Sequence, residues 1–313
     1  MVTMLRRLLC AASALACLLF MAAAPPPAPR RAVLVSWDGA KPAVLRTLLD
    51  RRRLPNLARL MREGRWSLEA RTVVPSLTLP SHVSMLTGVS PRVHGVLWND
   101  DRPEAGTVSV PTVFEVAKAA GLRTAMVYGK SKFRTLLKPG TLDAAELVGG
   151  DSSAVARAAL RVLRDESPSL LLVHFAEPDA AGHGHGWGDA ASGAPPSREY
   201  QAALVSADHA LGRIVAALRA DGGWPRTFLV VTADHGGHGK THGSEDPQDM
   251  TIPWVAAGGL VLRQGKLAVP VSTLDTPRTA LAALGLTAPA TWEGKVIPCL
   301  VQAPVVTPLR RAA

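Results

Sequence analysis

The stretch that decides the fold is Ala32-Val33-Leu34-Val35-Ser36-Trp37-Asp38-Gly39. Its first six residues are almost wholly apolar, and an acidic residue and a glycine follow them at once. A strand that is apolar on both faces is typical of a parallel sheet buried between helices. Further strands are predicted at Thr124–Val127, Leu170–Phe175, Thr227–Thr232 and Trp254–Ala257. We therefore expect a mostly parallel central sheet.

Amphipathic segments separate these strands, which is the pattern of an α/β fold. The chain has 313 residues, of which 47% are hydrophobic, and this is enough for a sizeable core. Helices are predicted at Pro42–Glu63 with an interruption at Pro55, and at Thr112–Ala120, Ser152–Asp165, Arg198–Ala220 and Thr276–Leu284. The expected fold is α/β, with the sheet between helix layers.

The beginning of the chain has the features of a secretory signal peptide. Two arginines precede an apolar run from Leu8 to Ala23, and Ala22-Ala23-Ala24 supplies small residues for cleavage. An uncleaved membrane anchor is the alternative, although the run is short for a span. We predict a secreted or periplasmic protein with no membrane span after cleavage. The predicted divisions are a signal peptide over residues 1–24, a linker over 25–31, one domain over 32–303 and a tail over 304–313.

Charge and cysteine content narrow the class of protein. The formal net charge is +10, which favours small anionic substrates through long-range attraction. The arginines are scattered and no aromatic platform accompanies them, so the sequence argues against nucleic-acid binding. Cys10 and Cys17 lie in the predicted signal peptide, which leaves Cys299 and no internal disulfide. Nothing in the sequence indicates an oligomeric state.

Three acidic residues follow predicted strands at corresponding places. Asp38 comes directly after the first strand, Asp179 lies four residues beyond Phe175, and Asp234 lies two residues beyond Thr232. In open α/β sheets, ligand sites gather at the carboxyl ends of the strands. We therefore expect these carboxylates to converge although they are far apart in the sequence.

Histidines accompany two of these aspartates. Asp234-His235-Gly236 places a carboxylate and an imidazole on one tight turn, and Asp179 and His183 share a face if their segment is helical. His242 is expected to fold back and complete the second group, with His238 as the competing candidate. Carboxylate oxygen and imidazole nitrogen suit Zn²⁺ and similar divalent ions. The two clusters predict two divalent metal ions and favour zinc.

A hydroxyl nucleophile is expected beside these ions. Thr78 lies in Pro75-Ser76-Leu77-Thr78-Leu79-Pro80-Ser81-His82, where two prolines restrict the chain. Taken alone, a threonine in such a stretch is more often an ordinary turn or capping residue. Beside two metal ions, however, a hydroxyl is suited to phosphoryl-type transfer. The assignment of Thr78 thus depends on the two clusters.

Together these residues resemble the alkaline phosphatase superfamily, and within it the type I phosphodiesterase/nucleotide pyrophosphatase family. The resemblance covers about Ala32 to Lys295 and implies an alkaline-phosphatase-like fold. The segments that carry it are Trp37-Asp38-Gly39, Thr78-Leu79-Pro80-Ser81-His82 to Thr87-Gly88, Pro91, His94-Gly95, Asn99, Glu177-Pro178-Asp179-Ala180-Ala181-Gly182-His183 and Asp234-His235-Gly236-Gly237.

The resemblance also implies a role for each site residue. Thr78 would attack phosphorus and form a phospho-threonine that water hydrolyses. Asn99 and the backbone N–H of Thr78 would bind the non-bridging oxygen. The substrate would be a small phosphate ester cleaved at a phosphodiester or nucleotide-pyrophosphate bond. One ion would be held by Asp38, Thr78, Asp234 and His235, and the other by Asp179, His183 and His242.

Departures from the family pattern keep alternatives open. Ser81 stands where the nucleotide enzymes often carry asparagine, and the chain is short, so nucleotide specificity is not implied. Lys132-Phe133-Arg134, close to Lys130, has the form of a Lys-x-Arg pair that grips a monoester in some related phosphatases. A Thr-dependent phosphomonoesterase using Lys132 or Arg134 is therefore the runner-up. A non-catalytic relative that binds metal and recognises an anionic ligand is a third possibility, and the Cys-x-Pro-x-Arg signature of sulfatases does not occur.

Overall fold

The computed structural model describes residues 30–263 and 265–300. The predicted signal peptide, most of the predicted linker and the predicted tail therefore lie outside the described residues. Arg31, which the prediction places in the linker, is the first residue of the first strand. Within the described ranges, none of the helices has the length and apolar character needed to cross a membrane.

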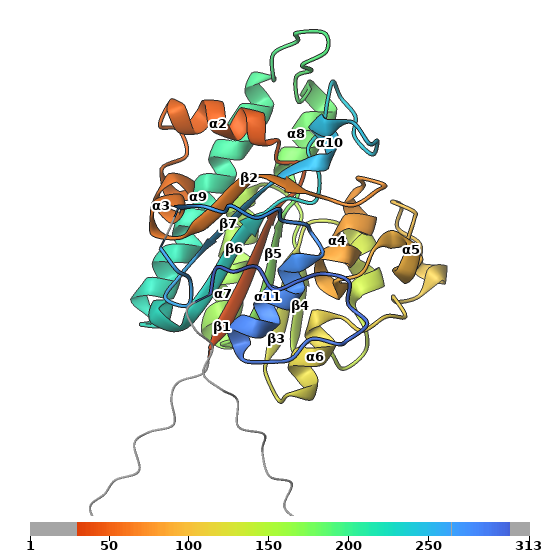
Figure 1. Ribbon diagram of the computed structural model, residues 1–313, viewed down its shortest axis with the longest axis vertical. Helices are drawn as coiled ribbons and strands as arrows, with labels where there is room; N and C mark the ends of the chain where they lie inside the picture. The colour runs from red at the N-terminus through yellow and green to blue at the C-terminus, as the bar shows by residue number, and fades with distance from the viewer. Residues whose placement is uncertain (1–29, 264, 301–313) are drawn as a thin grey trace, which may run out of the picture.

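An eight-stranded sheet runs through the centre of the molecule (Figure 1). Its spatial order is β4-β3-β5-β1-β6-β7-β2-β8. Strand β1 lies between β5 and β6 and is parallel to both, whereas β7 is antiparallel to its neighbours. The predicted mostly parallel sheet is confirmed. The strands are β1 Arg31–Trp37, β2 Arg65–Arg71, β3 Thr124–Tyr128, β4 Ala144–Leu147, β5 Leu170–Phe175, β6 Thr227–Thr232, β7 Thr251–Ala257 and β8 Gly265–Lys266.

Helices cover both faces of this sheet (Figure 1). Helices α2, α3, α7 and α9 pack on one face, and α4, α6 and α11 pack on the other. The helix predicted over 42–63 divides at Pro55 as expected, because proline begins a helix readily but interrupts one. The helices are α2 Pro42–Asp50, α3 Pro55–Glu63, α4 Thr78–Thr87, α5 Pro91–His94, α6 Val113–Ala119, α7 Ser152–Asp165, α8 Glu177–His185, α9 Arg198–Ala220, α10 Pro247–Met250 and α11 Asp275–Leu284.

The core lies around the three central strands. Every residue of β5 and β6 is buried, and so is every residue of β1 after Arg31. Truncating a core leucine such as Leu34 to alanine would cost about 2–5 kcal/mol, because it loses apolar contacts and leaves a cavity. This packing fixes the three strand ends that lead to Asp38, Asp179 and Asp234.

Several elements were not predicted from the sequence. Strand β4 consists of Ala144, Ala145, Glu146 and Leu147, which favour helix by propensity, yet its pairing with β3 makes it a strand. Helix α8 forms although it contains Gly182 and Gly184, which weaken a helix. Tertiary packing therefore overrides local preference in both places.

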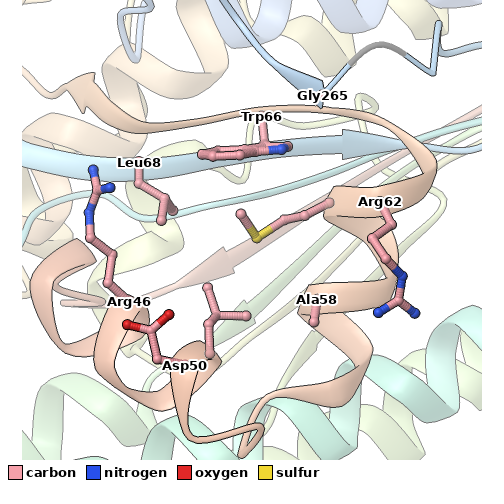
Figure 2. A pocket seen from close by; sticks show the side chains of 9 residues that line it. Arg46, Asp50, Ala58, Arg62, Trp66, Leu68 and Gly265 are labelled. Carbon is pink, nitrogen blue, oxygen red and sulfur yellow. The ribbon is translucent and has the colours of Figure 1, made fainter.

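A hollow of about 630 Å³ opens between α2, α3 and β2 (Figure 2). Its floor is apolar and two arginines lie at its rim. None of the three aspartates or their neighbouring histidines lines it, so it is separate from the site described below. The lining residues are Arg46, Leu49, Asp50, Ala58, Met61, Arg62, Trp66, Leu68 and Gly265.

Candidate active site

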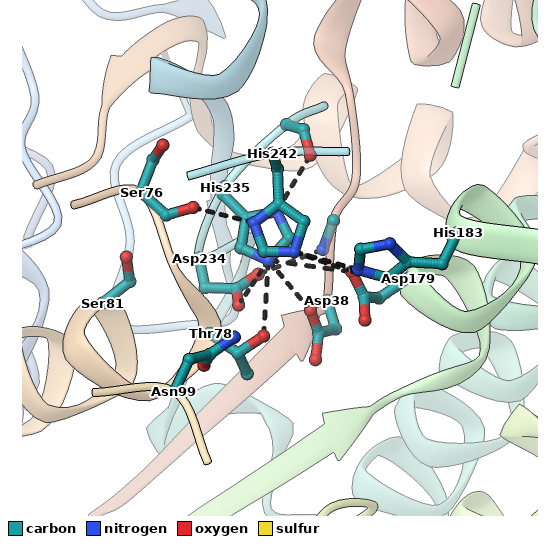
Figure 3. A network of polar contacts seen from close by, with 12 residues as sticks. Asp38, Ser76, Thr78, Ser81, Asn99, Asp179, His183, Asp234, His235 and His242 are labelled. Atoms are coloured by element: carbon teal, nitrogen blue, oxygen red, sulfur yellow. Dashed lines mark hydrogen bonds and ion pairs between the residues drawn. The ribbon is translucent and has the colours of Figure 1, made fainter. Parts of the chain in front are cut away.

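Three aspartates from three separate strands meet at the carboxyl edge of the sheet (Figure 3). Asp38 directly follows β1, Asp234 follows β6, and Asp179 lies in the first turn of α8 after β5. Each side chain is almost completely buried. Because parallel strands end at one edge, residues far apart in the sequence become neighbours there.

The first group of possible metal ligands surrounds His235 Nε2. Asp38 Oδ1 and Asp234 Oδ2 each lie 3.3 Å from this nitrogen, and Thr78 Oγ1 lies 3.5 Å from it. A tetrahedral zinc ion with bonds of about 2.0 Å separates its ligand atoms by about 3.3 Å. The spacing of this group therefore suits one divalent ion.

The second group surrounds Asp179 Oδ1. This oxygen lies 3.5 Å from His183 Nε2 and 3.6 Å from His242 Nε2, and the two nitrogens are 3.1 Å apart. The two groups adjoin, because the rings of His235 and His242 stack with their centroids 3.6 Å apart. Two ions held here would be close neighbours, as two-metal chemistry requires.

The three histidines present a free nitrogen to the site. Nδ1–H of His235 donates to the carbonyl oxygen of Gly236, that of His183 donates to Lys240, and that of His242 donates to Ser76. A carbonyl can only accept, so each Nδ1 carries a proton, and in the neutral imidazole it is Nε2 that offers its lone pair to a metal ion. Such backbone contacts orient imidazoles for metal binding.

One oxygen of each aspartate also lacks a hydrogen-bond partner. These oxygens are Asp38 Oδ1, Asp179 Oδ1 and Asp234 Oδ2, the same atoms that approach the histidine nitrogens. An unpaired oxygen on a buried carboxylate is costly unless a cation satisfies it. The donor set and its unsatisfied atoms therefore fit two divalent metal ions.

The second carboxylate oxygen of each aspartate has polar partners within the protein. Asp38 Oδ2 accepts a hydrogen bond from His174 Nε2 at 2.9 Å and forms an ion pair with Lys130 Nζ at 2.6 Å. Asp179 Oδ2 accepts from Lys130 Nζ at 2.6 Å, and Asp234 Oδ1 accepts from the Gly39 N–H at 3.0 Å. These contacts turn the unsatisfied oxygen of each carboxylate towards the histidines.

The crowding of carboxylates shifts the proton affinities of the site. Burial and the neighbouring Asp38 carboxylate raise the pKa of Asp234 to about 7. Burial alone would lower the pKa of His235, but the Asp234 and Asp38 carboxylates raise it to about 9. Burial and the nearby His235 lower the pKa of His242 to about 4, so this imidazole is neutral at pH 7. Without metal, the first group therefore retains protons near neutral pH.

Thr78 lies at the first position of α4 and is buried beside the first group. The first-turn N–H groups of a helix have no acceptor within the helix, and its N-terminus favours negative charge. Asn99 Oδ1 accepts the Leu79 N–H at 3.0 Å, which leaves the amide N–H₂ of Asn99 available as a donor. Lys130 Nζ lies 3.2 Å from Thr78 Oγ1. Donors thus surround the place where a phosphoryl oxygen would sit beside Thr78.

Two other residues considered from the sequence, His238 and Arg134, lie outside this cluster. His238 Nδ1 lies 2.7 Å from the buried Asp249 carboxylate, whereas His242 lies with the metal-ligand candidates. Arg134 is half exposed and pairs with Asp101 at 2.7 Å, so it does not enter the cluster. Lys130 contacts the cluster directly, whereas the partly buried Lys132 interacts electrostatically with Asp38, Asp179 and Asp234 and forms no hydrogen bond or ion pair with them among the described residues.

The sequence prediction did not place Lys130, His174 or Trp187 at the site. Lys130 follows β3 at the same sheet edge as the aspartates, so the rule that located Asp38 could have located it. Trp187 lies in an irregular glycine-rich segment, and its ring contacts the rings of His183 and His242. No periodicity marks such a residue in the sequence.

Comparison with known proteins places this geometry in context. Residues 32–245 match the model of the family described as type I phosphodiesterase/nucleotide pyrophosphatase. The chain is 26% identical over 227 residues to mouse ectonucleotide pyrophosphatase/phosphodiesterase family member 3, covering 65% of this chain and 24% of that protein. It is 26% identical over 223 residues to human family member 1, covering 65% and 23% respectively. The chain thus spans about a quarter of the length of these relatives.

Solved structures support the fold. A putative sulfatase from Bacteroides thetaiotaomicron superposes with a TM-score of 0.71 at 15% identity, covering 86% of this chain and 74% of that one. An inactive variant of murine ectonucleotide pyrophosphatase/phosphodiesterase 5 in complex with AMP superposes with a TM-score of 0.66 at 15% identity, covering 83% and 96%. The predicted alkaline-phosphatase-like fold is confirmed.

Proposed function

Because the chain belongs to the type I phosphodiesterase/nucleotide pyrophosphatase family, we propose that it is a two-metal phosphodiesterase with Thr78 as nucleophile. The observation that carries the proposal is the position of Thr78 Oγ1, at the N-terminus of α4 and 3.5 Å from His235 Nε2. Asp38, Asp234 and His235 would hold one ion together with Thr78. Asp179, His183 and His242 would hold the other.

Two divalent ions, when bound, supply positive charge that favours ionised hydroxyl and stabilises the oxygens around phosphorus. Thr78 Oγ loses its proton to solvent and forms a bond to phosphorus, while the bond from phosphorus to the leaving-group oxygen breaks. That oxygen keeps the electron pair and takes a proton from water. A second water then cleaves the phospho-threonine, which releases a phosphomonoester and restores Thr78.

The remaining residues act on charge and position. The amide N–H₂ of Asn99 and the Thr78 N–H would donate to the non-bridging oxygen, where negative charge grows in the transition state. Asn99 is held for this task by the Leu79 N–H. Zinc suits the mixed oxygen and nitrogen ligands, although manganese, iron and cobalt use similar sets.

A phosphomonoesterase is a second candidate, favoured by Lys130. Two divalent ions exceed the charge of the three aspartates by one, and the Lys130 ammonium adds another positive charge within 2.6 Å of two of them. A phosphodiester carries one negative charge, whereas a monoester carries about two near neutral pH. The added charge would suit the monoester.

The decisive experiment compares kcat/KM for an aryl phosphodiester and the matching aryl phosphomonoester on zinc-loaded protein. A ratio well above one supports the phosphodiesterase, and a ratio well below one supports the monoesterase. In either case Thr78→Ala should lower turnover on the order of 10³-fold or more while the protein stays folded. Full turnover in that variant would show that Thr78 is not the nucleophile, and absence of turnover in all forms would favour a non-catalytic binding protein.

A further inference from the structure

Lys130 joins the two groups of metal-ligand candidates. It lies two residues beyond β3, which pairs with β5, and its side chain reaches the aspartates at the carboxyl edge of the sheet. Lys130 Nζ lies 2.6 Å from Asp38 Oδ2 and 2.6 Å from Asp179 Oδ2. The two carboxylates belong to different groups, so one ammonium contacts a ligand candidate of each proposed ion.

We propose that Lys130 is a positioning residue. It contacts one aspartate of each ligand group and leaves each of these two aspartates a single oxygen for metal binding. This inference rests on the ligand assignment of the proposed function and goes beyond it, because it gives Lys130 a role in metal coordination. The role concerns Asp38 and Asp179 alone, since Asp234 is held by the Gly39 N–H.

The division of oxygens within each carboxylate supports this role. Lys130 occupies Oδ2 of Asp38 and of Asp179, whereas Oδ1 of each is buried without a hydrogen-bond partner. Short ammonium–carboxylate contacts are among the stronger hydrogen bonds in proteins. A carboxylate with both oxygens free can bind one cation through both, but an occupied Oδ2 leaves only Oδ1. The contacts of Lys130 would therefore keep the coordination number of each ion low.

The same contacts argue against Lys130 as a mere substitute for metal. A substitute cation would contact the atoms that ligate the ion, which here are the unsatisfied Oδ1 oxygens. Lys130 instead contacts the two Oδ2 oxygens at 2.6 Å, and its one contact with a proposed ligand atom, Thr78 Oγ1, is longer at 3.2 Å. Asp38 Oδ2 is also shared with His174 Nε2 at 2.9 Å. The Gly129 N–H donates to His174 Nδ1, so His174 also acts as a donor towards Asp38. Lys130 thus belongs with the residues that orient the ligands.

The test measures the affinity of the Lys130→Met variant for metal. The variant is purified with metal bound, and the metal is then removed before the titration. A chromophoric chelator measures the affinity of both zinc ions, and the visible spectrum of the cobalt-substituted protein reports coordination number. We expect both affinities to fall about 10–100-fold, the effect typical of losing an orienting partner of a ligand. The cobalt bands should weaken and shift as Asp38 and Asp179 each take up a second oxygen contact.

Two further variants distinguish the positioning role of Lys130 from a general effect of positive charge and from an effect on folding. Lys132→Met removes the same charge from the adjoining turn, and in the described part of the chain no hydrogen bond or ion pair joins Lys132 to either aspartate. It should keep the parental cobalt spectrum. Lys130→Arg keeps a cation that can contact both carboxylates, so it should restore most of the affinity if Lys130→Met does not fold.

Three outcomes would overturn the inference. Unchanged affinities and spectrum in Lys130→Met, with turnover alone reduced, would assign Lys130 to the substrate. Tighter metal binding in that variant would show that Lys130 competes with the ions. Loss of affinity for one ion only would show that it does not brace both groups. Failure of the parent protein to bind two ions would instead contradict the proposed function, so the two failures are distinguishable.

Discussion

Trp187 donates its indole N–H to the carbonyl oxygen of Gly39 across 2.8 Å. The same buried ring packs against Gly182 and Gly237, where an added Cβ would lie 2.2 Å and 2.5 Å from ring atoms. Each of the three glycines adjoins a metal-ligand candidate or its turn. One ring therefore fixes the spacing of the turns that carry Asp38, His183 and His235, and this explains why those motifs are rich in glycine.

Gly182→Ala should destabilise the protein and weaken metal binding. The new methyl group would meet Trp187 at 2.2 Å, and overpacking of this kind costs about 1–3 kcal/mol. Gly184 is the matched control, because it lies in the same helix and its added Cβ would meet nothing within 4 Å. Gly184→Ala should be neutral or stabilising by up to about 1 kcal/mol. Urea unfolding of both variants measures the difference, and equal stabilities would contradict the role of Trp187.

The site shows which features a sequence can reveal. Asp38, Asp179 and Asp234 were predictable as a group because parallel strands end at one edge, whatever their separation in sequence. Lys130 obeys the same rule, but lysine is not an expected ligand of zinc, and the basic residues considered for the alternative monoesterase were Lys132 and Arg134. Position was therefore easier to predict than the contact that each side chain makes.

Packing against distant residues explains the rest. The contacts of Trp187 with the three glycine turns depend on tertiary structure that no local pattern encodes. Strand β4 has residues that favour helix and becomes a strand only by pairing with β3. Such elements are determined by their partners, and a single sequence does not name those partners.

Metal uptake should release protons near neutral pH. In the metal-free protein, burial and Asp38 raise the pKa of Asp234 to about 7. Burial by itself would lower the pKa of His235, but the Asp234 and Asp38 carboxylates raise it to about 9. Both groups must lose their protons to bind a cation, so affinity should increase from pH 6 to about pH 9 and then level off. Calorimetry in two buffers of different ionisation enthalpy measures the protons released.

Asp234→Asn provides the control for this pH dependence. It removes the carboxylate that raises the pKa of His235 most strongly, so that imidazole should be largely neutral at a lower pH. Fewer protons should then be released per ion at pH 7.5. Equal release in the parent and the variant, or none in the parent, would show that these two groups do not govern metal binding.

His242→Ala and His238→Ala should differ in metal content. His242 Nε2 lies 3.6 Å from Asp179 Oδ1, and its loss should reduce bound metal from about two ions per chain towards one. His238 is tied to Asp249 at 2.7 Å, so its replacement should leave about two ions bound. Elemental analysis after gel filtration measures both. Retention of both ions in His242→Ala would transfer the assignment away from His242.

Asn99→Asp should impair turnover without unfolding the protein. The aspartate has the shape of Asn99 and can still accept the Leu79 N–H, which lies 3.0 Å from Asn99 Oδ1. It loses the N–H₂ donor and places negative charge where charge develops on the non-bridging oxygen. The loss of one such donor typically lowers kcat about 10²–10³-fold, and the added charge acts in the same direction. Steady-state kinetics and a thermal unfolding curve test this directly, with Asn99→Ala as the variant that also loses the acceptor. If Asn99→Asp turned over like the parent, Asn99 would only cap the start of α4 and the oxyanion would be stabilised by other groups.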